Sequence, residues 1–474
     1  MRVLHVIDRL GAGGPSRAIA GEAAAARRLG LRQQHRLAVL EPGSAPAMAI
    51  AAHRAGIALR RVPDPAWLAE SIAWAEIVVA QYWNTPSMTE FLESCRGAAR
   101  MVMRCRVAGL HPPQMLAEDI AATADHLILG SPATAALAWL GAPAWRERVS
   151  VIAPSADPAR LEGFVPRPHR GFVVAYVGTV GGTKLHPRFV AMSAAARIPE
   201  VRFVVCGGHD PGLVAEAARL GVADRFVFPG FVEDVRAVLE EADLLGYPLR
   251  PDAYASSDLS LQEAMWCGIP PVLLPHLGTG WMVEHGRSGV VAADEAGYSA
   301  ALELLHARPD ERARLGQGAR LRARALFDPD RTARSLDEAL RGVLAAPQRR
   351  APPRPPDRQP FAAARRFVRA LGPHGAAFAA SLRQERGAAE AADAAIGVLP
   401  DEQRGGEGGL VHWRNRHRED GYLRYWTGLC LAGSGRLAEA RRELEEAAAL
   451  GAAPGRVEAR LAALGKDDTA TSGR

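Results

Sequence analysis

Lys184 is the residue of this chain whose type most clearly suggests chemistry. It ends the segment Gly-Thr-Val-Gly-Gly-Thr-Lys, which begins at Gly178, directly after an apolar run. The chain has 58 lysines and arginines together, yet Lys184 and Lys466 are its only lysines. Because an ammonium group is a compact charge suited to a phosphate, a lysine kept in an arginine-rich protein indicates phosphate binding. A lysine left there by chance is the alternative interpretation.

A second glycine-rich loop follows the first apolar run. The segment Gly-Ala-Gly-Gly-Pro-Ser-Arg places Gly11, Gly13 and Gly14 directly before a predicted helix. Glycines let a ligand approach the backbone closely, and a helix N-terminus favours an anion. Ser16 occupies the last glycine position of a dinucleotide-binding fingerprint, so the loop indicates an anion site of another kind or only a tight turn.

Glu263 lies in the first turns of the predicted helix Ser-Leu-Gln-Glu-Ala-Met-Trp-Cys-Gly. A carboxylate in this position either compensates the helix dipole or accepts hydrogen bonds from a pair of hydroxyl groups, such as those of a ribose. The string Asp328-Pro329-Asp330 has the spacing of a metal-binding motif, but it stands where a helix is expected to begin. We predict that it caps that helix and that the chain binds no metal.

These residues follow the strands of two predicted parallel sheets. From the first residue, short β-branched runs such as RVLHVID and EIVVAQYW alternate with alanine-rich helical runs, and after residue 165 the alternation restarts with GFVVAYVG. Continuously apolar strands between helices are typical of a parallel sheet covered on both faces. The prediction is two doubly wound α/β domains, at 1–165 and 166–346. In such sheets ligands bind beyond the carboxyl ends of the strands, where the loops described above lie.

The remainder of the chain is predicted to be helical. Residues 347–360 contain six prolines and indicate an extended linker. Residues 361–465 are predicted to form a small all-α domain, and residues 466–474 a disordered tail. Six residues of this domain have the spacing of a single tetratricopeptide repeat, although a generic helical hairpin explains them equally well: Gly428, Gly435, Ala440, Leu444, Ala447 and Pro454.

The charge distribution argues against nucleic acid as a partner. The formal net charge is +6, and residues 346–370, with seven arginines and one aspartate, account for all of it. A basic, proline-rich stretch between domains is typical of a solvated linker, whereas nucleic-acid binding needs a basic folded face. Contact with an anionic membrane surface is the alternative, because Phe361, Phe367 and Val368 stand beside three arginines.

The chain also lacks the sequence marks of export. The first residues, MRVLHVID, place charged or polar side chains where a signal peptide needs an apolar stretch, and the uncharged run 265–283 contains three prolines. The five cysteines include no C-x-x-C pair, so neither a zinc site nor a disulfide framework is expected. We expect a cytoplasmic protein, with the inner membrane face as the alternative location.

Six segments of the second half then point to a family when they are taken in order. They are YVGTVGGTK, VRFVVCGG, DRFVFPGFVEDV, ADLLGYP, LQEAMWCGIPPV and HGRSGVVA. The series resembles the donor domain of the retaining glycosyltransferases of family 4. The resemblance extends from residue 1 to about 344, since GGPSR and VIAPSADPARL resemble segments of the family's first half and of its passage into the second. It implies the GT-B fold, in which two Rossmann-like domains face each other across a cleft, a UDP- or GDP-sugar as donor, and no cofactor.

The resemblance also implies roles for individual residues. By this resemblance, Lys184 binds the donor diphosphate and Glu263 holds the ribose hydroxyls, while Gly13, Gly14 and Arg17 face the leaving group. The further donor-binding positions that it implies are Gly178, Thr179, Gly208, Ser257 and Leu259.

The chain departs from the family's pattern at three positions. Thr179 stands where an arginine usually follows the strand glycine, and Ala255 replaces the first glutamate of the E-x7-E pair. Trp281 stands where an acidic residue is common. Thr179 and Ala255 thereby remove two charges from the donor side of the expected site.

Nearby residues supply candidates for the missing groups. Asp252 and Asp258 are the carboxylates that can take the place of the absent glutamate, and we predict Asp258, which joins Lys184 and Glu263 as a catalytic candidate. On the acceptor side the candidate is His111, in Ala-Gly-Leu-His-Pro-Pro-Gln. A structural loop histidine is the alternative there.

The sequence therefore predicts a metal-independent glycosyltransferase. It would move a sugar, with retention of configuration, from a nucleoside-diphosphate sugar to a glycan, lipid-linked or other acceptor. The alternative is a catalytically degenerate scaffold, favoured by Thr179 and Ala255, that binds a protein partner through its helical tail.

Overall fold

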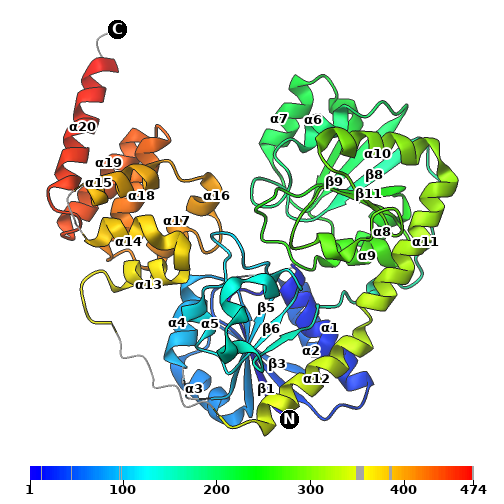
Figure 1. Ribbon diagram of the computed structural model, residues 1–474, viewed down its shortest axis with the longest axis horizontal. Helices are drawn as coiled ribbons and strands as arrows, with labels where there is room; N and C mark the ends of the chain where they lie inside the picture. Colours follow the sequence, from blue (N-terminus) through cyan, green and yellow to red (C-terminus); the bar gives the residue numbers. More distant parts are fainter. Residues whose placement is uncertain are drawn as a thin grey trace. The chain divides into compact units, whose positions relative to one another are not determined.

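The computed structural model of the 474-residue chain describes all residues except 12, 44, 96, 98, 349–356, 384–386 and 472–474, and only the backbone at 402 and 465–471. The chain divides into two compact units. The first, here the α/β unit, comprises residues 1–82, 99–108 and 125–348. The second, here the helical unit, comprises residues 83–98, 109–124 and the described part of 349–474 (Figure 1).

The α/β unit contains two parallel sheets. The first has seven strands in the order β3-β2-β1-β4-β5-β6-β7, and every pairing is parallel. Its strands are β1 (Arg2–Ile7), β2 (Gln34–Val39), β3 (Ile57–Arg61), β4 (Ile77–Tyr82), β5 (Met101–Cys105), β6 (His126–Leu129) and β7 (Val149–Val151). All six residues of β4 are buried, because this central strand is covered on both faces.

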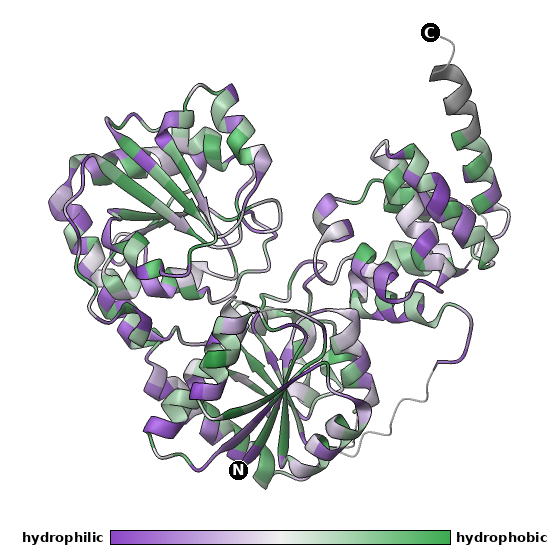
Figure 2. Ribbon diagram, turned by 180° about the vertical axis from the view of Figure 1, so that it is seen from behind, coloured by the Kyte–Doolittle hydropathy of each residue, from purple (hydrophilic) through white to green (hydrophobic). Residues whose placement is uncertain are grey.

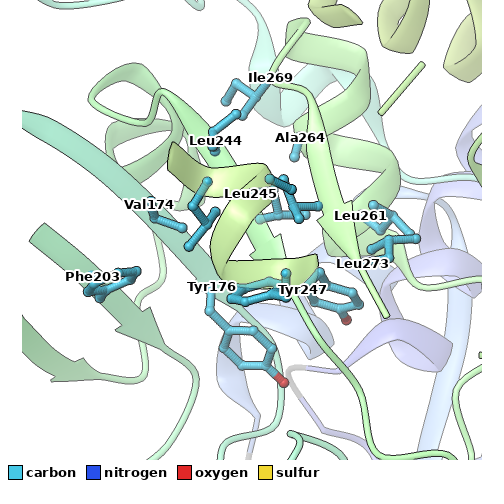
Figure 3. Packing of buried hydrophobic residues seen from close by; sticks show 14 of the residues in the cluster. Val174, Tyr176, Phe203, Leu244, Leu245, Tyr247, Leu261, Ala264, Ile269 and Leu273 are labelled. Carbon is cyan, nitrogen blue, oxygen red and sulfur yellow. The ribbon is translucent and has the colours of Figure 1, made fainter. Parts of the chain in front are cut away.

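The second sheet has six parallel strands in the order β10-β9-β8-β11-β12-β13. They are β8 (Phe172–Val177), β9 (Val201–Cys206), β10 (Phe226–Gly230), β11 (Leu244–Tyr247), β12 (Pro271–Leu273) and β13 (Val290–Val291). Figure 3 shows the apolar cluster that holds this half together, in which Val174, Leu245 and Leu273 of the sheet lie among side chains of a covering helix such as Leu261 and Ala264.

Helices connect the strands in both halves. Those of the first half are α1 (Gly14–Arg28), α2 (Pro46–Arg54) and α3 (Pro65–Trp74), and those of the second are α6 (Phe189–Ala194), α7 (Pro211–Arg219), α8 (Val235–Glu240), α9 (Leu259–Cys267), α10 (Glu295–Ala307) and α11 (Pro309–Leu326). The prediction of two doubly wound Rossmann-like domains is confirmed, and Figure 2 shows apolar residues concentrated on the strands of both sheets.

Both sheets reverse their strand order beside their first strand. In the first sheet the reversal lies between β1 and β4, and in the second it lies between β8 and β11. Loops that leave neighbouring strands in opposite directions open a space for a ligand at such a point. The loops beyond β1, β8 and β11 carry the candidate residues of the site.

Helix α12 (Pro329–Ala345) corrects one expectation. The predicted second domain, 166–346, includes this helix, but Leu340 and Val343 of α12 pack with Val3, Ile77 and Val102 of the first sheet. The second domain therefore ends near Leu326, and the last helix before the linker returns to the first domain.

The helical unit also differs from the predicted domain 361–465, because it includes α4 (Pro86–Ser94) and α5 (Glu118–Ala121) from within the predicted first domain. Its other helices are α13 (Ala362–Ala370), α14 (Ala376–Arg383), α15 (Ala388–Gly397), α16 (Asp401–Gly405), α17 (Leu410–Arg416), α18 (Gly421–Gly433), α19 (Leu437–Ala449) and α20 (Arg456–Thr471). Since α20 continues to Thr471, the tail predicted to be disordered from 466 is helical up to that residue. Most of the predicted linker 347–360 lies outside the described residues.

Helices α18 and α19 form a closely packed pair. A Cβ atom built on Gly428 would lie 2.8 Å from Leu444 Cγ, so only glycine lets the two helices approach this closely. Ala440, Leu444 and Ala447 are completely buried in the same pair. This is the packing that a tetratricopeptide unit requires, and the assignment to that repeat stays a prediction.

Helix α13 joins α4 through charged side chains. Arg366 Nε and Arg369 Nη2 donate to the two oxygens of Glu93, at 2.8 and 2.9 Å. The neighbouring Phe367 is buried in the core of the helical unit. Three residues of the basic, apolar stretch that suggested a membrane contact, Arg366, Phe367 and Arg369, therefore have partners within the unit, and the membrane contact stays a prediction. Among the described residues, no helix is long and apolar enough to cross a membrane.

Candidate functional site

Lys184 lies in a buried cluster beyond the ends of β8 and β11. Its Nζ atom is 3.1 Å from Oδ2 of Asp258, which also accepts a 2.8 Å hydrogen bond from the hydroxyl of Tyr247. The Lys184 side chain is 8% exposed and that of Asp258 is 14% exposed. The backbone is joined here as well, because the amide of Arg250 donates to the carbonyl of Lys184. Two loops from adjacent strands thus place one cation and one carboxylate together.

The electrostatics of this cluster keep Lys184 charged. Burial acts to lower the pKa of the ammonium group, but Asp258 and, after it, the phenol groups of Tyr254 and Tyr176 raise it above its ordinary value. Tyr247 lies beneath the ammonium, 5.5 Å from Nζ to the ring centroid, and its ring stacks on that of Tyr176 (Figure 3). The result is a fixed positive charge next to a glycine-rich loop.

Glu263 forms a second buried cluster on α9. One carboxylate oxygen, Oε1, accepts a 2.8 Å hydrogen bond from Nη1 of Arg160 and lies 3.7 Å from Nη1 of Arg17. The other oxygen, Oε2, has no hydrogen-bond partner among the described residues. The residue is 1% exposed, and burial raises the pKa of the carboxyl group while Arg160 and Arg17 oppose that rise. A carboxylate with one buried, unpaired oxygen is a natural acceptor for a hydroxyl group of a ligand.

The N-termini of α1 and α9 meet beside these clusters. A Cβ atom on Gly14 would lie 3.6 Å from Cγ of Leu259, the first residue of α9, and Leu259 packs with Ala18 of α1. Neither helix is capped by the side chain of its N-cap residue, Gly13 in α1 and Asp258 in α9. Their first-turn N–H groups therefore keep the capacity to bind an anion.

The remaining predicted donor residues line the same loops. A Cβ atom on Gly207 would lie 1.7 Å from the carbonyl oxygen of Gly178, so the loops after β8 and β9 touch through backbone, and Gly208 lies 3.7 Å from Val180 by the same measure. The Thr179 hydroxyl is 3.1 Å from that of Tyr254. These positions shape the loop that leads to Lys184.

Ser257, which the resemblance implies to be a donor-binding residue, is hydrogen-bonded to another side chain of the protein. Its hydroxyl and its carbonyl both accept from Nε2 of Gln262, whose Oε1 accepts from the amide of Ala156. Gln262 thereby ties the loop before α9 to the segment that connects the two sheets.

Ala255 is packed under the next loop. It is 1% exposed, and a Cβ atom on Gly278 would lie 1.8 Å from the Ala255 carbonyl oxygen. Trp281 donates its indole N–H to the carbonyls of Ser256 and Gly278, which holds that loop in place. The alanine and the tryptophan that depart from the family's pattern thus belong to one tightly packed loop pair.

Asp252 lies outside the two clusters described above, and His111 belongs to the other unit. Asp252 forms an ion pair with Arg250, with Nε and Oδ1 2.6 Å apart. His111 lies in the helical unit, where it is half-buried. Asp328, the first residue of the D-x-D string, accepts from the amide of Arg331 at the start of α12, so the predicted helix cap is confirmed.

Sequence reasoning missed Arg160 and Tyr247. Arg160 is one of very many arginines, and only its place in the segment VIAPSADPARL suggested a passage between domains. Tyr247 belongs to an apolar strand, where a tyrosine is ordinarily a core residue. No pattern of spacing connects either residue to Glu263 or Lys184, because the fold brings them together over long separations.

Taken together, the described side chains provide two chemical functions. Lys184 and Arg17 are cations near two open helix N-termini, an arrangement that suits a diphosphate. Glu263 offers a hydroxyl-binding oxygen. The two functions lie on the loop after β8 and on helices α1 and α9 of one unit, where a single ligand with phosphate and sugar parts can use both.

Parts of the amino-acid sequence are similar to a known family and to named proteins. Residues 171–308 match the family described as Glycosyl transferases group 1. The D-inositol 3-phosphate glycosyltransferase of Salinispora arenicola is 29% identical over 315 residues, which cover 59% of this chain and 68% of that enzyme. The enzyme of the same name from Salinispora tropica is 28% identical over 305 residues, which cover 57% of this chain and 61% of the relative.

Solved structures are similar in fold. The Anabaena protein HepE in complex with UDP and glucose has a TM-score of 0.60 at 18% identity, covering 72% of this chain and all of that one. WaaG, a glycosyltransferase involved in lipopolysaccharide biosynthesis, has a TM-score of 0.54 at 18% identity, covering 72% of this chain and all of that one. At this identity the likeness shows the fold alone, that of two Rossmann-like domains.

Proposed function

We propose that this chain, a group 1 glycosyltransferase of the GT-B fold that uses a nucleotide sugar, transfers the sugar with retention of configuration and without a metal ion. The donor would be a UDP- or GDP-sugar, and the acceptor a glycan, a lipid-linked molecule or another acceptor. The relatives named above act as inositol-phosphate glycosyltransferases, and HepE was crystallised with UDP and glucose. The proposed donor class, a nucleotide sugar, follows from these names.

The observation that carries the proposal is the pair formed by Lys184 and Glu263. Lys184 is a buried cation in a glycine loop, and Glu263 keeps one buried oxygen without a partner. A nucleoside diphosphate has phosphates for the first and ribose hydroxyls for the second. We assign the diphosphate to Lys184 and the ribose to Glu263.

Catalysis would depend mainly on stabilisation of the leaving diphosphate. Negative charge accumulates on that group as the bond to the sugar breaks, and fixed cations or helix N-termini aimed at it lower the barrier. Lys184, Arg17 and the N-terminus of α1 would supply this charge, with Asp258 holding Lys184 in place. Because these groups can carry the role usually given to a bound cation, we expect activity to survive EDTA. Activity lost in EDTA and restored by magnesium would contradict this part of the proposal.

The proposed cellular location is the cytoplasm. The five cysteines are all free and buried, as suits a reducing compartment such as the cytoplasm. The acceptor would then be met on the cytoplasmic side, in solution or at the membrane surface.

The test is nucleotide binding followed by turnover. Calorimetry with UDP and with GDP should show binding of one of them, and a panel of UDP- and GDP-sugars should identify a donor whose nucleotide is released. Glu263→Gln should weaken binding and abolish release. If neither nucleotide binds and no donor is consumed, the proposed function is wrong; nucleotide binding without turnover of any donor would favour the degenerate scaffold.

A further inference from the structure

Arg160 connects three parts of the donor half. It lies on the short 3-10 helix Pro158–Leu161, in the segment that leads from the first sheet to the second. Its Nη1 atom donates to Glu263 Oε1 at 2.8 Å, and its Nη2 atom donates to the carbonyl of Glu233 at 3.0 Å. Both ends of the guanidinium are therefore held, one by the carboxylate and one by the loop after β10.

The charge balance at Glu263 depends on this arginine. Burial raises the pKa of the Glu263 carboxyl group, and Asp157 nearby adds to the rise. Arg160 is the strongest influence in the other direction, followed by Arg17 on α1. Burial and the charge of Arg160 lower the pKa of the Arg17 guanidinium in turn. Two arginines thus face one carboxylate, and Arg160 is the one in direct hydrogen-bond contact.

The direction of the carboxylate depends on Arg160 as well. A hydrogen bond to Oε1 fixes the rotation of the carboxyl group, so Oε2 is left as the oxygen without a partner among the described residues. An ionised carboxylate accepts at both oxygens, whereas a neutral carboxyl group carries a proton on one of them. Loss of the arginine would change both the charge and the orientation of the acceptor.

We propose that Arg160 is a positioning residue of the donor site, which holds Glu263 ionised and turned so that Oε2 accepts from hydroxyl groups of the bound nucleoside. The inference rests on the proposed function. It adds a residue that acts through Glu263 and does not itself touch the donor.

Calorimetric titration with UDP and GDP tests this role between pH 6.5 and 8.5. The titration uses whichever nucleotide the unaltered protein binds. At pH 6.5 the Arg160→Met variant should bind that nucleotide about tenfold more weakly, which is the effect of a change of one unit in the pKa of Glu263. The variant should regain affinity as the pH rises and Glu263 ionises. Arg160→Lys, which keeps the positive charge, should lose less. The unaltered protein should change less over the same pH range, because its Glu263 is already paired.

Two further variants separate positioning from simple structural damage. Arg225→Met removes a guanidinium that donates to the carbonyls of Ala194 and Ala196 in the same half, so it is the matched control and should leave nucleotide affinity unchanged. Arg160→Met added to Glu263→Gln should cause no further loss, since the residue through which Arg160 acts is already neutral.

The outcomes distinguish this inference from the proposed function. Equal affinity and an equal pH profile for Arg160→Met and the unaltered protein would overturn the positioning role alone. An additional loss in the double variant would overturn it too, because Arg160 would then act independently of Glu263. Failure of the unaltered protein to bind either nucleotide would overturn the proposed function, and this inference with it.

Discussion

At the scale of single residues, the ion pair between Lys184 and Asp258 shows how this chain keeps a charge inside a packed loop. Both side chains are largely buried, and Tyr247 donates to the same Asp258 oxygen that the ammonium approaches. Such a pair contributes little net stability compared with apolar residues of similar size, but the removal of one partner is costly. The pair is better explained by the need for a positioned cation than by stability.

Lys184→Met should therefore have two separate effects. It leaves Asp258 without its cation, so the free energy of unfolding should fall by about 3 kcal/mol. It also removes the proposed phosphate ligand, so nucleotide binding should be lost. Urea denaturation and calorimetry measure the two quantities.

The double variant Lys184→Met with Asp258→Asn provides the control. Removing the orphaned charge should restore most of the stability and none of the binding. Recovery of nucleotide affinity in the double variant would show that Lys184 contributes to the fold alone.

Ala255 gives a second prediction at this scale. Its carbonyl is covered by Gly278 and the residue is 1% exposed, so a longer acidic side chain has no solvated space there. Ala255→Glu, although it restores the residue common in the resembled family, should destabilise the fold by about 3 kcal/mol or more through a buried, unpaired charge and should not raise turnover. Thermal unfolding and donor consumption are the measurements, and a more active variant of unchanged stability would prove the prediction wrong.

At the scale of elements, local sequence predicted the strands and the loops that follow them. Apolar runs such as those of β4 and β8 can be recognised because a strand covered on both faces needs apolar residues throughout. The placement of α12 could not be predicted in this way. Its periodicity shows that one face is buried, but not that Leu340 and Val343 pack on the first sheet.

The pairing of β1 with β2 brings two histidines together, and their titration gives a third prediction. Nε2 of His5 lies 3.0 Å from Nδ1 of His35, a contact that needs one ring to donate and the other to accept. Burial, with His35, Arg104 and Arg106, lowers the pKa of His5. Burial and the amino terminus lower the pKa of His35 to about 4, against the opposing effect of Glu22.

Acid should therefore destabilise the protein between about pH 6.5 and pH 4. In that window the unfolded chain binds a proton at His35 and the folded chain does not, so the free energy of unfolding falls as the pH falls. The fall in the pKa of His35 from 6.5 to about 4 corresponds to about 3 kcal/mol at most. His35→Gln should flatten this part of the profile, as measured by urea denaturation at several pH values. His53→Gln, at an exposed position, should leave it unchanged, and equal slopes for the two variants would contradict the assignment.

At the scale of the whole molecule, the division into units is the feature that sequence reasoning could least foresee. The composition change near residue 347 marked a helical extension correctly, but nothing in the segment Pro86–Ser94 indicates that it packs with residues three hundred positions later. In the sequence, Glu90 and Glu93 cannot be distinguished from two carboxylates on the solvated face of a helix. Only the fold shows that Arg416 and His417 reach Glu90, and that Arg366 and Arg369 reach Glu93.

Polar contacts of the helical unit extend this attachment to the loops that follow β4 and β5. The backbone N–H of Asn84 donates to the side-chain oxygen of Gln114, and the side-chain amide of Asn84 donates to the carbonyl of Ala370. Gln114 in turn donates to the carbonyl of Glu407. Because these bonds are buried or partly buried, the extension is part of the structure around residues 83–98 and 109–124 and not a separable tail.

Truncation after residue 348 should consequently damage the remaining chain. It would leave Glu93, Asn84 and Gln114 without partners that they have in the intact protein, and unsatisfied buried polar groups cost about 1–3 kcal/mol each. We expect a lower melting temperature and faster amide hydrogen exchange in 83–98 and 109–124, measured by calorimetry and mass spectrometry.

A charge reversal in the intact chain tests the contact of Glu93 with Arg366 and Arg369 without removing the helical extension. Glu93→Arg alone should lower the melting temperature, because it places a third arginine beside Arg366 and Arg369. Adding Arg366→Glu and Arg369→Glu should recover much of the loss, since the opposite charges face each other again. A truncated chain that melts and exchanges like the intact protein, or a triple variant no more stable than Glu93→Arg, would mean that the helical extension is an independent module after all.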